Sequence, residues 1–164
     1  MPRSFDSVFY GAAGTSTGED IVTDQLYWHV DAANSDSYSG SGTTWTDLIS
    51  SQNATLVNTP TYSTSSANGG GAFFFNGSDE YATTAFTKTQ AAFSTSAWFK
   101  PSTQGGGAQH VIMNSFESSS AEWWALSVEG TGRGKPEWIC DNDSSKVTLI
   151  GDDVCADSWQ MITG

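Results

Sequence analysis

Short runs in which apolar and polar residues alternate recur along most of the chain. In residues 93–100, for example, Phe93, Ala97 and Phe99 fall on one face, and Pro101 follows. A period of two is typical of a strand with one buried face, and proline ends a strand because it lacks the N–H donor. The pattern predicts strands over residues 26–30, 54–57, 72–75, 80–86, 93–100, 110–113, 123–129, 136–140, 147–150 and 158–162.

Turn-forming residues separate these runs. Asn76-Gly77 follows the apolar run 72–75, and this dipeptide favours positive φ, so it predicts a tight hairpin turn into residues 80–86. No stretch repeats apolar residues at spacings of three and four, as an amphipathic helix would. The sequence therefore predicts an all-β fold, an antiparallel β-sandwich or a barrel.

The 164 residues are enough for one domain with a real core. Residues 1–25 contain a Gly-, Ser- and Thr-rich stretch with little apolar content, so we expect a flexible N-terminal arm followed by a β-sandwich domain over residues 26–164. The side chains expected in its core are Phe73, Phe75, Phe93, Ala97, Phe99, Val128 and Leu149.

The net charge of the chain limits the kinds of partner that it can bind. It carries 18 acidic and 6 basic residues, a net charge of −12. This surface repels phosphate backbones and anionic membranes, so we expect neither as a partner, while cations and neutral sugars fit it. The N-terminus has no apolar stretch of signal-peptide length, so we expect synthesis in a cytoplasm without export. Two cysteines give neither a disulfide framework nor a zinc motif.

Several segments resemble one family in their order and spacing. They are residues 21–24, 26–34, 37–48, 53–62, 73–81 and 93–101. Together they resemble concanavalin A-like (laminin-G-like) jelly-roll domains of the kind found in bacteriophage virion proteins. The resemblance covers roughly residues 21–164 and implies a jelly-roll sandwich. In that family more strands follow the one that resembles residues 158–162, so we expect a C-terminally truncated sandwich whose open edge contacts a second protein.

The resemblance implies a non-enzymatic virion structural protein of a tailed bacteriophage. Its place would be the virion surface, in capsid decoration or in a tail or fibre, with other virion proteins and copies of itself as partners and host-surface glycans as a further ligand. The alternative is a secreted or cell-surface carbohydrate-binding module, because this fold hosts many functions. We expect no enzyme: a glycosidase needs two facing carboxylates, whereas Glu122 and Glu129 are seven residues apart and fall on opposite faces of a regular strand.

Two sets of residues are candidates for binding. Exposed aromatic rings stack on sugars, and the candidates for that role are Trp98, Trp123, Trp124 and Trp138, although core packing would also account for them. Ca²⁺ prefers oxygen ligands, and the candidates are Asp141, Asp143, Asp152 and Asp153 across a possible hairpin. Aspartates are also ordinary turn residues, so a role of these four in turns and not in metal binding stays open. Apart from Ca²⁺, no cofactor is expected.

Overall fold

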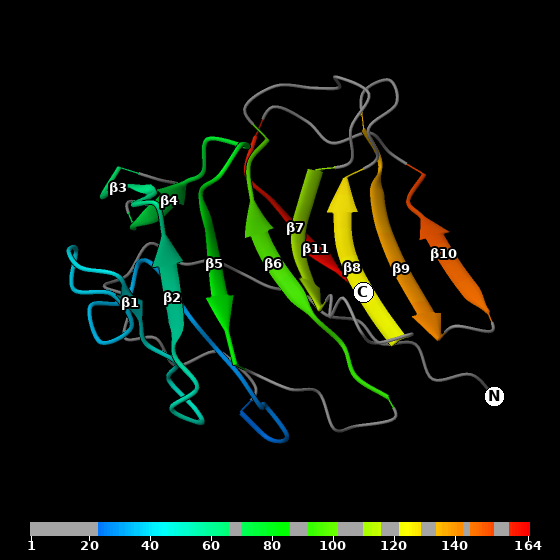
Figure 1. Ribbon diagram of the computed structural model, residues 1–164, viewed down its shortest axis with the longest axis horizontal. Coiled ribbons are helices and arrows are strands. Elements are labelled where there is room, and N and C mark those ends of the chain that lie inside the picture. The colour runs from blue at the N-terminus through cyan, green and yellow to red at the C-terminus, as the bar shows by residue number, and fades with distance from the viewer. Residues whose placement is uncertain are drawn as a thin grey trace, which may run out of the picture. The chain divides into compact units, whose positions relative to one another are not determined.

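A computed structural model describes most of the chain from Thr23 onwards. The described residues are 23–65, 70–85, 92–101, 110–115, 122–128, 134–142, 145–152 and 158–164. Every regular element among them is a β-strand, and every strand pair is antiparallel (Figure 1). The prediction of an all-β, antiparallel chain is confirmed, and the sheets are compatible with a β-sandwich. Within these residues there is no helix that is long and apolar enough to cross a membrane.

The contacts divide the chain into two compact units, and the first comprises Met1–Phe75 with Glu80–Phe86. Its strands are β1 (Thr44–Trp45), β2 (Ala54–Val57), β3 (Thr61–Ser63), β4 (Ala72–Phe74) and β5 (Tyr81–Thr84). β1, β2 and β5 form a three-stranded sheet in that order, and β3 and β4 form a separate pair.

A cluster of aromatic rings joins the elements of the first unit. The ring of Phe73 lies 4.7 Å from that of Tyr38, 4.8 Å from that of Trp45 and 5.5 Å from that of Tyr62, centroid to centroid. The contacts with Tyr38 and Trp45 are edge-to-face, the arrangement that aromatic quadrupoles favour. Since Trp45 is on β1 and Phe73 on β4, this cluster packs the two sheets of the unit together.

The same cluster requires a glycine at position 71. The hydroxyl of Tyr62 donates a hydrogen bond of 3.0 Å to the carbonyl of Ala32, and Gly71 lies against this bond. A Cβ at Gly71 would come within 2.2 Å of the Tyr62 hydroxyl oxygen and 2.3 Å of the Ala32 carbonyl oxygen. The backbone can approach this closely only because glycine has no side chain.

The second unit comprises Asn76–Asp79 and Thr87–Gly164. Its strands are β6 (Ser96–Phe99), β7 (His110–Ser115), β8 (Glu122–Val128), β9 (Pro136–Asn142), β10 (Lys146–Ile150) and β11 (Gln160–Thr163). The four-stranded sheet has the order β10-β9-β8-β7, and β11 and β6 form a two-stranded ribbon. The amide and carbonyl of Gly164 extend this ribbon through hydrogen bonds to Thr95 of 3.0 and 2.9 Å.

The central strand β8 is buried on both faces. Trp124, Leu126 and Val128 point to one face and are 8%, 0% and 4% exposed. Ala125 and Ser127 point to the other face and are 5% and 0% exposed. The sequence permits this because its run of small and apolar residues is nearly continuous, the pattern of a strand covered on both sides.

Two predicted elements differ from the structure. Residues 26–30 form no strand; instead the N–H of His29 donates to the side chain of Asp47, and its carbonyl accepts from Leu48. The predicted hairpin of residues 72–75 with 80–86 is also wrong, because β4 pairs with β3 and β5 pairs with β2. Gly77 does have the positive φ of 69° that the Asn-Gly pair favours, but the bend at this point joins no hairpin.

The predicted core is correct in part. Val128 is buried, while Phe73, Phe93, Ala97 and Phe99 are half-buried. Phe75 and Leu149 were expected to be buried, but they are 44% and 62% exposed. Leu149 is exposed because β10 is the outermost strand of the described sheet, and Phe75 because it follows the last residue of the short strand β4.

Candidate functional site

The carboxylate of Asp47 is a buried acceptor in the first unit, 5% exposed. Its Oδ1 accepts hydrogen bonds from the amides of His29 at 2.9 Å and Ile49 at 3.1 Å. Its Oδ2 accepts from the amide of Ser50 at 2.9 Å, the hydroxyl of Ser50 at 2.5 Å and the amide of Gln52 at 3.1 Å. The side chain thus holds an irregular segment together where no strand partner is available.

This environment also fixes the charge of Asp47. Burial alone would raise its pKa, but the hydrogen bonds from the His29 amide and from Ser50 and Ile49 outweigh burial and lower the pKa from 3.8 to about 2. Asp47 is therefore ionised at neutral pH and serves the fold. The sequence analysis did not identify it; the serine three residues later, which an aspartate can bind in a local turn, was the available signal.

An exposed pair of apolar side chains lies in the second unit, on the outer face of the β6–β11 ribbon. Trp98 and Met161 are direct cross-strand partners and are 64% and 53% exposed. Beside them the hydroxyls of Ser96 and Thr163 are hydrogen-bonded to each other at 3.0 Å. We call these four residues the ribbon face. It combines a large apolar area with two hydroxyl groups.

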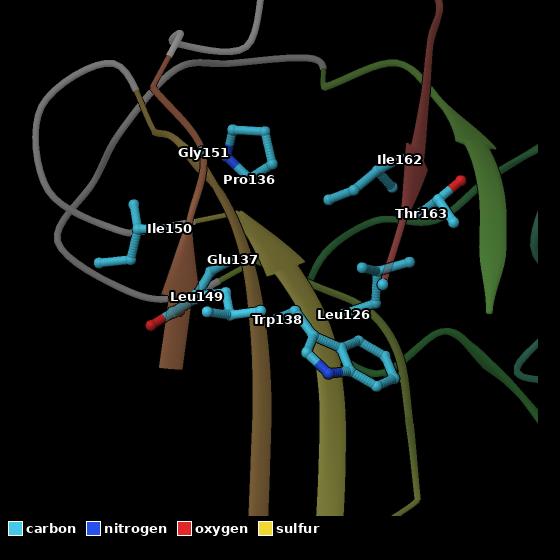
Figure 2. A pocket seen from close by; sticks show the side chains of 10 residues that line it. Leu126, Pro136, Glu137, Trp138, Leu149, Ile150, Gly151, Ile162 and Thr163 are labelled. Atoms are coloured by element: carbon cyan, nitrogen blue, oxygen red, sulfur yellow. The ribbon is translucent and has the colours of Figure 1, made fainter. Parts of the chain in front are cut away.

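The opposite side of the ribbon borders a cleft of about 320 Å³ over the four-stranded sheet (Figure 2). Its lining is mainly apolar, with contributions from Leu126, Pro136, Trp138, Leu149, Ile150 and Ile162, and it also includes Glu137, Thr163, Gly151 and Gly164. Gly164 packs on the indole of Trp138, where a Cβ would meet the ring carbon Cε3 at 2.3 Å. Leu149 and Ile150 of β10 form one of its walls.

Strand β10 itself presents apolar side chains at the edge of the described sheet. Val147, Leu149 and Ile150 are 52%, 62% and 48% exposed, and β9 is the strand that pairs with β10. The sequence analysis placed Leu149 in the core and so did not identify this edge. A strand edge of this kind offers N–H and C=O groups to a further strand.

The four candidate tryptophans lie in three different settings. Trp98 belongs to the exposed ribbon face. Trp124 and Trp138 stack on each other with ring centroids 5.4 Å apart, and the ring of Phe93 lies 5.4 and 5.7 Å from them. Trp123 is on the opposite face of β8 from Trp124, where the ammonium group of Lys146 lies 5.7 Å from its ring centroid. Of the four, Trp98 is therefore the one most accessible for stacking on a ligand.

The candidate calcium ligands can be placed in part. Asp141 pairs with Lys146 at the turn end of the β9–β10 hairpin. Asp152 follows Gly151, which is bonded to Pro136 at the other end of this hairpin. The register thus holds these two carboxylates apart, and Asp143 and Asp153 lie outside the described residues. In the part of the chain that the structure describes, no three His, Cys, Asp or Glu side chains group together as metal ligands.

No family model, no curated protein and no solved structure matches this chain.

Proposed function

We propose that this chain is a non-enzymatic structural protein of a tailed-phage virion, with a jelly-roll β-sandwich of the concanavalin A-like kind. It would act by binding other proteins of the capsid or tail through exposed apolar surfaces of its strands. The sequence resemblance suggests the virion, and the antiparallel all-β architecture is compatible with the sandwich.

The observation that carries a binding role is the ribbon face. Trp98 and Met161 place two large apolar side chains side by side in solvent, whereas the neighbouring inward residue Ile162 is 8% exposed. Tryptophan and methionine are enriched at protein interfaces, and contiguous exposed apolar residues are typical of a site that another molecule covers. The paired hydroxyls of Ser96 and Thr163 supply a polar border.

The test uses particles of a phage that encodes the chain. The protein is expected in gradient-purified virions by mass spectrometry, and the purified chain is expected to bind virions that lack it. Trp98→Ser should weaken this binding, while Tyr81→Ser, at a 53% exposed aromatic residue in the first unit, should leave it unchanged. Absence of the protein from intact particles would overturn the proposal.

A second candidate function is carbohydrate binding, which the same ribbon face favours. A sugar ring could stack on Trp98 while its hydroxyls bond to Ser96 and Thr163. This function is tested by titrating the chain with neutral oligosaccharides while its tryptophan fluorescence is measured. A saturable change that Trp98→Ser abolishes would favour this function over protein binding, and no change with a broad set of glycans would reject it.

A further inference from the structure

We infer that β10 is a self-association edge, at which two copies of this chain join their four-stranded sheets by antiparallel pairing of Lys146–Ile150. The inference concerns the isolated chain and does not rest on the proposed virion role. Three features carry it: the exposure of the strand, the symmetry of its sequence and the cleft beside it.

The exposure of β10 is unusual for an edge strand. Each of its five residues is exposed, and three are apolar. Natural edge strands are commonly protected by charged residues, proline or a bulge, because an open edge templates the addition of another strand. On β10 the charge of Lys146 lies at the end of the strand, next to the ring of Trp123, and the run from Val147 to Ile150 has no such protection.

The sequence of β10 favours the same strand of a second copy as its pairing partner. In an antiparallel pair centred on Thr148, Val147 of each copy lies opposite Leu149 of the other, and the two Thr148 residues face each other on the two-fold axis. All five residues then have partners. Cross-strand pairs of β-branched or aliphatic side chains and of threonines are the favourable ones in sheets.

The faces of the two sheets also match in this arrangement. Leu149 is the cross-strand partner of Trp138, so it shares the apolar face of the sheet that lies under β11. Val147 of the second copy would cover Leu149 at the rim of the cleft and would extend the apolar row that begins at Leu126. On the opposite face Lys146 of one copy would lie opposite Ile150, two residues from the exposed Asp152 of the other.

The net charge of −12 acts against this association and makes it salt-dependent. Only one strand pair joins the copies, so the interface is small and the dimer should be weak. We therefore expect a monomer–dimer equilibrium in the micromolar range, shifted toward the dimer when added salt screens the mutual repulsion of the acidic copies.

Sedimentation of the full chain over about 5–500 µM tests the inference. The weight-average mass should rise toward that of a dimer, and Leu149→Lys should raise the dissociation constant by about tenfold or more. Tyr81→Lys is the matched control, because Tyr81 is 53% exposed in the first unit, whereas β10 and the ribbon face belong to the second, and it should leave the equilibrium unchanged. A monomer at all concentrations, or a dimer that Tyr81→Lys weakens as much as Leu149→Lys, would overturn the inference.

Oxidative cross-linking then tests the register, in a chain whose Cys140 and Cys155 are replaced by serine. In the predicted pair the two copies of residue 148 have Cα atoms about 4.5–5.5 Å apart, within disulfide range. Thr148→Cys should therefore cross-link rapidly to its own copy. Ile150→Cys should not, because its two copies are offset by four residues, about 13 Å. Equal cross-linking of both variants would contradict this pairing.

Discussion

Replacement of Asp47 by asparagine should destabilise the first unit, because the site is built for an ionised acceptor. In Asp47→Asn the remaining oxygen can still accept from His29 and Ile49, but an amide NH₂ then faces the N–H groups of Ser50 and Gln52. Two buried or part-buried donors lose their acceptor, and each such loss costs about 1–3 kcal/mol.

The magnitude also follows from the pKa. A lowering from 3.8 to about 2 means that the folded state favours the ionised carboxylate by about 2 kcal/mol. Because the folded pKa is depressed, this stability is present above about pH 4 and is lost as the pH falls toward about 2. We therefore expect Asp47→Asn to lower the free energy of unfolding by about 2–4 kcal/mol at pH 7 and by much less at pH 2.

The assay is urea unfolding at several pH values, with hydrogen exchange in peptides of residues 26–57 as the readout for the first unit. The difference between wild type and variant isolates Asp47 from the other acidic groups, which titrate in both proteins. Asp36→Asn makes the same charge change at an exposed side chain and should change stability by less than about 0.5 kcal/mol. Equal stability of wild type and Asp47→Asn at pH 7, or a difference independent of pH, would refute the reasoning.

Three further predictions concern packing. Gly71→Ala should destabilise the first unit by about 1–3 kcal/mol in urea titrations, because its Cβ would collide with the hydroxyl of Tyr62; wild-type stability would refute the close approach. Trp124→Ala should cost about 3–5 kcal/mol, because its ring is 8% exposed and stacked. Trp98→Ala, at a 64% exposed ring, should change the free energy of unfolding by no more than about 0.5 kcal/mol. A larger loss of stability would mean that the ribbon face is covered.

The local pattern predicted the positions of most strands. The alternation in residues 93–100 predicted β6 with Trp98 outward and Ala97 and Phe99 inward, as observed. The apolar runs at 123–129 and 136–140 likewise became β8 and β9. Strand positions are set by side-chain periodicity within a few residues, so the sequence alone was sufficient for them.

Strand pairing could not be read from the same pattern. The turn at Gly77 suggested a local hairpin, but β5 pairs with β2, which is more than 20 residues away along the chain. Trp98 of the ribbon face was among the predicted candidates, but the apolar edge of β10 was missed for a similar reason. Leu149 has the sequence of a core strand, and it is exposed because β10 lies at the edge of the described sheet. Asp47 binds donors in irregular backbone, which carries no periodic signal.

The division into two units determines what a spectroscopic measurement reports. Five of the seven tryptophans, Trp98, Trp123, Trp124, Trp138 and Trp159, belong to the second unit, and only Trp28 and Trp45 belong to the first. Intrinsic fluorescence therefore follows mainly the second unit, while the carboxylate of Asp47 and the Phe73 cluster stabilise the first. If the units melt separately, a fluorescence midpoint would describe the second unit alone, and acid loosening of the first would pass almost unnoticed.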